Sequence, residues 1–134
     1  MTLLRLNIES EEILNFYKSS EILNRMAQVD RMDQFVVAMA LGYSLGSKTQ
    51  LNGTKSLILE SSISKDNLAL LNIVAIADTG DVKVISDKKQ VFKIAEQYAN
   101  TGVKYMMENY EKSSQFGEAS DEFEGVVNSV FENL

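Results

Sequence analysis

The sequence predicts a mainly α (α+β) fold with four to five helices and a small two-stranded β element. Proline is absent and glycine occurs seven times among 134 residues, and proline is the residue that helix interiors exclude most strongly. Residues 31–46 and 66–79 are apolar on nearly every helical face, which is typical of buried helices. At 45% hydrophobic residues, the chain can bury a core without metal or disulfide support. We expect one helical domain, residues 1–112, followed by an acidic C-terminal segment, residues 113–134.

The first elements are predicted from short local signals. Residues 3–8 are expected to form a short strand. Ser10, followed by Glu11 and Glu12, has the pattern of an N-cap with acids in the first helical turn. The helix is expected to reach about residue 27, and a break at Ser19-Ser20 stays open.

The next helix is expected to begin after Asp30 and to end at Gly46. Gly42 lies inside it and costs about 1 kcal/mol relative to alanine, so we expect another backbone to pack closely there. Residues 47–54 are polar and form a loop. Residues 56–60 have a strand pattern.

The second apolar helix is expected to begin with Ser64 or Asp66 as its cap and to end at Gly80. In residues 81–86, Val82 and Val84 alternate with Lys83, which predicts a half-buried strand. We pair that strand with residues 56–60.

Asp87 and Gln90 resemble a capping box and open the longest helix, residues 88–112. The side chains expected to face the core are Val91, Ile94, Ala95, Tyr98, Gly102, Tyr105 and Met106. Those expected to face away are Lys89, Lys93, Glu96, Gln97, Asn100, Lys104 and Glu108.

The net charge of −6 is concentrated at the C-terminus, where residues 111–134 carry six acids against Lys112. Residues 121–134 are expected to form an amphipathic helix, free in solvent or docked on a partner. The candidate partner-binding residues are Glu118, Asp121, Glu122, Phe123, Glu124 and Phe131.

Composition excludes several kinds of chemistry. Cysteine and histidine are absent, so thiol catalysis, structural zinc and imidazole acid–base catalysis are unavailable. The chain has no basic excess, which disfavours direct nucleic-acid binding. No signal peptide or membrane span is evident, so we expect a cytoplasmic protein without membrane contact.

Two motifs resemble active-site signatures. Asp78-Thr79-Gly80 is the triplet of aspartic proteases, but the residues before it are predicted as helix. Asp81 also stands where a small residue belongs. Residues 42–49, "GYSLGSKT", are close to a phosphate-binding loop, yet they end a helix, whereas such a loop opens one. We interpret both as helix ends and Lys48 as solvated.

Two further readings are weaker. Asp78, Asp81, Asp87 and Glu96 are carboxylates of the kind that bind divalent cations, but turn and cap roles suit them better. Residues 3–8 before two helices suggest a ribbon-helix-helix DNA-binding dimer, for which only Arg5 is a suitable basic strand residue. We therefore predict no catalytic residues, no cofactor and no metal.

Three stretches carry a resemblance to a known family: "DQFVVAMALGYSLGSKTQL", "NLALLNIVAIADTGDVKVIS" and "KIAEQYANTGVKYM". Over about residues 30–110 the chain resembles small proteins associated with bacterial DNA phosphorothioation (Dnd) systems. The resemblance implies an accessory role in phage defence and no catalytic residues. The low basic content and the acidic segment depart from what DNA contact would need.

Our hypothesis is a non-enzymatic accessory protein that binds protein partners, such as DNA-modification or restriction proteins. One alternative is a DNA-binding regulator of such a locus, and another is an acidic DNA-mimic inhibitor of phage type. A homo-oligomer remains compatible with the sequence.

Overall fold

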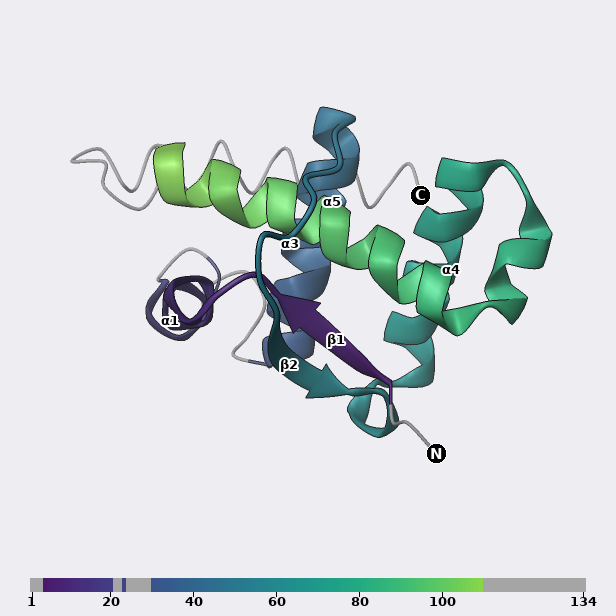
Figure 1. The fold of residues 1–134 in the computed structure, drawn as a ribbon, viewed down its shortest axis with the longest axis horizontal. Helices are drawn as coiled ribbons and strands as arrows, with labels where there is room; N and C mark the ends of the chain where they lie inside the picture. Colours follow the sequence, from purple (N-terminus) through teal and green to yellow (C-terminus); the bar gives the residue numbers. More distant parts are fainter. Residues whose placement is uncertain (1–3, 21–22, 24–29, 110–134) are drawn as a thin grey trace.

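The computed structural model describes residues 4–20, 23 and 30–109. It has the mainly α architecture with a small sheet that the sequence predicts (Figure 1). The elements are β1 (Arg5–Ile8), α1 (Glu11–Ser19), α3 (Arg31–Leu45), β2 (Lys55–Leu59), η1 (Glu60–Ser62), α4 (Lys65–Thr79), η2 (Val82–Ser86) and α5 (Lys88–Asn109).

The helix boundaries follow the predicted capping residues. The side chains of Ser10, Asp30 and Ser64 accept hydrogen bonds from backbone N–H groups of α1, α3 and α4. Gly46 and Gly80 end α3 and α4 with a φ of 71°, a left-handed conformation that glycine adopts without a steric penalty. These predictions are confirmed.

The sheet pairs two segments that the sequence did not match with each other. β1 lies antiparallel to β2, with Arg5 opposite Leu59. The prediction of a strand over residues 81–86 is wrong, because residues 82–86 form the 3₁₀ helix η2. The side chain of Asp81 caps η2 by accepting from Lys83 N at 2.9 Å, and this local bond favours a turn over a strand.

The helices α3 and α5 cross at the centre of the molecule, as Figure 1 shows. Gly42 of α3 meets Gly102 of α5 at the crossing. A Cβ atom on Gly42 would overlap the Tyr98 carbonyl group, and one on Gly102 would overlap that of Ala38. The close approach predicted at Gly42 is confirmed, and its partner is a second glycine.

The two apolar helices differ in burial. α3 is buried from Met32 to Gly42 except at Asp33, as predicted. In α4 only Leu71, Val74 and Ala75 are buried, so the expectation that this helix is covered on every side is wrong. Among the described elements, α4 packs mainly against α5, η2 and α3, and this packing leaves the other side chains of the helix partly or fully exposed.

Several predictions lie outside the described residues. They are the helix expected over residues 21–22 and 24–27, the end of the last helix beyond Asn109 and everything proposed for residues 113–134. α1 itself ends at Ser19, and Ser20 is extended, so the break considered at Ser19-Ser20 is present. None of the described helices is long and apolar enough to cross a membrane.

Candidate functional site

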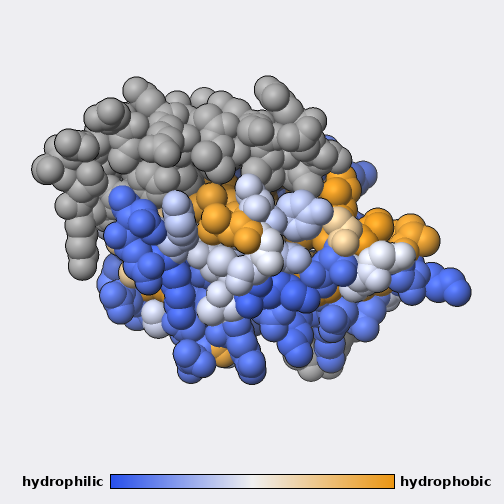
Figure 2. Space-filling view, turned by 90° about the horizontal axis from the view of Figure 1, so that it is seen from above, coloured by the Kyte–Doolittle hydropathy of each residue, from blue (hydrophilic) through white to orange (hydrophobic). Residues whose placement is uncertain are grey.

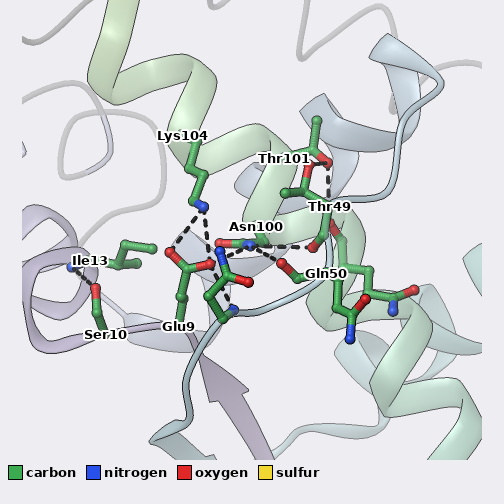
Figure 3. Close-up of polar contacts among 10 residues, drawn as sticks. Glu9, Ser10, Ile13, Thr49, Gln50, Asn100, Thr101 and Lys104 are labelled. Atoms are coloured by element: carbon green, nitrogen blue, oxygen red, sulfur yellow. Dashed lines mark hydrogen bonds and ion pairs between the residues drawn. The ribbon is translucent and has the colours of Figure 1, made fainter.

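A polar cluster ties the 47–54 loop and the end of β1 to α5 (Figure 3). Its centre is Asn100, which is 4% exposed, so the prediction that it faces away from the core is wrong. The Asn100 Nδ2 group donates to the carbonyl oxygens of Thr49 and Gln50 at 3.2 and 3.4 Å, and to Glu9 Oε1 at 3.3 Å. A side-chain amide at this position replaces the hydrogen bonds that the loop backbone would otherwise make to water.

The carboxylate of Glu9 completes this cluster. It accepts from Lys104 Nζ at 2.9 Å and from Asn52 N at 3.0 Å. Partial burial raises the pKa of Glu9, but the hydrogen bonds from Asn52, Lys104 and Asn100 outweigh burial and hold the pKa below its usual value. The carboxylate is thus ionised at neutral pH, and its bonds to Asn52, Asn100 and Lys104 tie the loop and the end of β1 to α5.

The two motifs that resemble active-site signatures meet in a second cluster. Asp78, from the Asp-Thr-Gly triplet, accepts from Lys48 Nζ at 2.9 Å and from Tyr98 Oη at 2.7 Å. Lys48, from the "GYSLGSKT" stretch, is exposed to solvent, as predicted, with 40% of its side chain accessible, and it also pairs with Asp78, which the sequence did not predict. Burial raises the pKa of Tyr98, and the hydrogen bond to Asp78 raises it further, so the phenol stays protonated at neutral pH.

The backbone at these motifs is that of helix ends. Gly80 follows α4 in the left-handed conformation, and the Thr79 side chain bonds back to the Ala75 carbonyl at 2.9 Å. In the other stretch the Ser47 amide donates to the Gly42 carbonyl, and the Thr49 amide donates to Gln97 O at 3.1 Å. These two amides serve helix capping and loop attachment, and do not converge on a phosphate.

Glu96 lies at a cavity beside β1. Its Oε2 atom accepts from the backbone N–H of Asn7 at 2.7 Å, so it links α5 to the strand. The cavity has a volume of about 310 Å³ and is also lined by Gln50, Lys93 and Gln97. Burial raises the pKa of Glu96 to about 7, although the bond from Asn7 opposes this. The sequence missed this partial burial, because a glutamate on a helix is ordinarily solvated.

The four carboxylates considered for a cation have separate roles. Asp78 binds Lys48 and Tyr98, Asp81 caps η2, Asp87 caps α5 at Gln90 N, and Glu96 binds Asn7. Among residues 4–20, 23 and 30–109, no three metal-ligating side chains are grouped in a way that would hold an ion. The N-terminal strand considered for a DNA-binding dimer pairs with β2 of its own chain.

An exposed apolar surface lies on α4 and η2. Ile73 is 39% exposed, Val82 62% and Ile85 41%, and we call these three residues the α4–η2 face. In Figure 2, hydrophobic residues appear in several places on this side of the molecule, and one group of them lies toward the right, where Figure 1 places α4. Large apolar side chains exposed together are typical of contact surfaces.

Within the described residues the fold is mainly helical, the polar clusters bond internally, and apolar side chains of α4 and η2 are exposed to solvent. The model of the family of DNA sulphur modification system-associated protein 4 matches residues 20–123. The chain belongs to this family, and the resemblance drawn from the sequence is confirmed. No curated protein and no solved structure matches the chain.

Proposed function

We propose that this chain is a non-catalytic accessory protein of a DNA sulphur modification system and acts by binding other proteins of that system. Its family is associated with such systems, which supports a role beside their enzymes. The polar groups described above are engaged with one another rather than directed at a common point. This arrangement favours contact over catalysis.

The observation that carries the proposal is the α4–η2 face. The central residues of α4, from Leu68 to Ala77, are apolar except at Asn72, yet Ile73 is exposed to solvent, as are Val82 and Ile85 of η2. Burial of such side chains against a partner contributes about 25 cal/mol for each Å² of apolar area removed from water. The partner surface that fits this face is itself apolar.

The test begins with recovery of the tagged chain from its native host after nuclease treatment, with co-eluting proteins identified by mass spectrometry. We expect stoichiometric recovery of sulphur-modification or restriction proteins. The double variant Val82→Ser, Ile85→Ser should lose them. Leu45→Ser is the matched control, since Leu45 is 44% exposed but ends α3.

A second pair of variants, Phe123→Ser and Phe131→Ser, tests the partner-binding residues predicted in the C-terminal segment. Loss of partners in this pair alone would move the contact from the α4–η2 face to that segment. Recovery of the chain by itself, at endogenous level, would refute a stable complex.

A further inference from the structure

A wide groove runs beside β2, away from the α4–η2 face. Its volume is about 570 Å³, and four consecutive β2 residues, 56–59, line it together with the start of α3 and Arg5. Successive side chains of a strand point to opposite faces. The register of β2 is irregular at Leu57, but four neighbours in a row border the same groove most directly when the edge of the strand faces it.

That edge of β2 has no strand beside it in the described part of the chain. The sheet contains β1 and β2 alone, and the other backbone hydrogen bonds of the described residues leave residues 55–59 without a second backbone partner. In an edge strand, half of the N–H and C=O groups point away from the neighbour and are free to pair.

The groove also carries two guanidinium groups that form no ion pair with any carboxylate among residues 4–20, 23 and 30–109. Arg5 donates to Ser56 Oγ at 3.1 Å and Arg31 donates to Gln34 Oε1 at 2.8 Å. Both acceptors are neutral, so these two hydrogen bonds do not balance the positive charges. The acid that lines the groove, Asp30, uses its Oδ1 to cap α3 at Met32 N.

We propose that this groove binds an extended acidic peptide, which adds to the free edge of β2 as a third strand. The peptide backbone would pair with the edge of β2, and its carboxylates would meet Arg5 and Arg31. Guanidinium groups bind carboxylates through paired N–H donors, and strand addition is a common mode of peptide recognition. Half-buried Leu57, Ile58 and Leu59 offer contacts for apolar side chains of the same peptide.

A lone oxyanion explains less of this groove, because it would leave the strand edge unpaired. A nucleic acid is also a poorer match, since the protein carries a net charge of −6 and the two arginines are accompanied by Asp30. The peptide uses both features, the edge and the charges.

The experiment is fluorescence anisotropy on the full chain, with a short labelled peptide of alternating glutamate and valine as the probe. The matched peptides are one with glutamine in place of glutamate and one N-methylated on alternate amides, which keeps its charge but cannot form a strand ladder. We expect binding of the first peptide and at least about tenfold weaker binding of both others. The amide signals of Ser56 to Leu59 should shift in NMR spectra.

Variants of the protein separate this groove from general charge attraction. Arg5→Gln with Arg31→Gln should weaken binding about tenfold or more, and Lys89→Gln, a change of an exposed cation on α5, should leave it unchanged. Equal binding of the N-methylated peptide, an equal effect of Lys89→Gln, or no binding of the acidic peptide would each overturn the proposal. So would tighter binding of a DNA oligonucleotide that competes with the peptide.

Discussion

Replacement of Glu96 by glutamine isolates the energetic effect of one half-buried carboxylate. Glutamine has nearly the same shape, and its amide oxygen can still accept from Asn7 N, which lies 2.7 Å from Glu96 Oε2. The exchange therefore keeps the link between α5 and β1 and removes only the ability to ionise. Any pH dependence that disappears with it belongs to this group.

The direction follows from the raised pKa, which burial moves from 4.5 to about 7. The folded protein holds this proton more tightly than the unfolded chain, so the contribution of Glu96 to stability is fully present below pH 4.5. It is lost as the pH rises to about 7, because the ionised group must then be kept partly out of water.

Each unit of difference between the pKa in the folded protein and the pKa in the unfolded chain corresponds to about 1.36 kcal/mol of stability. The full difference corresponds to about 3 kcal/mol, and partial access to solvent reduces this. The amide oxygen of glutamine is also a weaker acceptor than a carboxylate. We therefore expect Glu96→Gln to be about 2 kcal/mol more stable than the native chain at pH 8 and similar to it at pH 4.

The assay is urea unfolding followed by far-ultraviolet circular dichroism at both pH values, with linear extrapolation to water. Glu108→Gln is the control, since it removes an exposed carboxylate from the same helix. A stability difference between Glu96→Gln and the native chain that stays constant from pH 4 to pH 8 would refute the reasoning. The same result would indicate that the Glu96 side chain is solvated in both states.

Three other substitutions test the packing and the polar clusters by the same unfolding assay. Gly42→Ala should destabilise the fold by about 3 kcal/mol or more, because its Cβ would overlap the Tyr98 carbonyl of α5; a loss below about 1 kcal/mol would contradict the close helix crossing. Tyr17→Phe should leave stability unchanged or raise it by about 1 kcal/mol, because the buried hydroxyl has no hydrogen-bond partner in the described part of the chain; a large loss would reveal one. Asp78→Asn should cost about 1 kcal/mol near pH 7, where the native carboxylate binds Lys48 and Tyr98. Since its pKa is lowered, that difference should vanish as the pH falls below the usual carboxyl range.

Local rules were sufficient for the helix ends and insufficient for the pairings between them. Ser10, Asp30 and Ser64 cap helices because an N-cap depends on the few residues that follow it. The pairing of β2 with β1, rather than with residues 81–86, depends on the path of the whole chain in the tertiary structure. The alternation of Val82, Lys83 and Val84 is too short to separate a strand from a 3₁₀ turn.

The candidate sites were harder to predict, because burial is a property of the tertiary structure. Glu96 and Asn100 were assigned to the solvent face of α5 from helical periodicity. The 47–54 loop and β1 lie against that face and partly or wholly cover both side chains. Helical periodicity describes one helix at a time, so it cannot predict that a loop from another part of the chain covers polar residues of that helix. The error for α4 was the opposite one. Its apolar composition predicted that the whole helix is buried, but Ile73 is exposed to solvent.

The two proposed surfaces should respond differently to salt, and this separates them experimentally. The α4–η2 face is apolar at Ile73, Val82 and Ile85. Complete burial of a fully exposed apolar side chain of this size contributes about 1.5–3 kcal/mol, and these partly covered side chains contribute less. Binding there should change little between low salt and about 1 M salt. Peptide binding beside β2 depends on Arg5 and Arg31, and charges at a solvent-exposed groove are screened within about 3 Å at 1 M salt. We expect the binding of the acidic peptide to weaken about tenfold over the same range. If the protein partner dissociates in high salt and the acidic peptide does not, the two surfaces have been assigned the wrong way round.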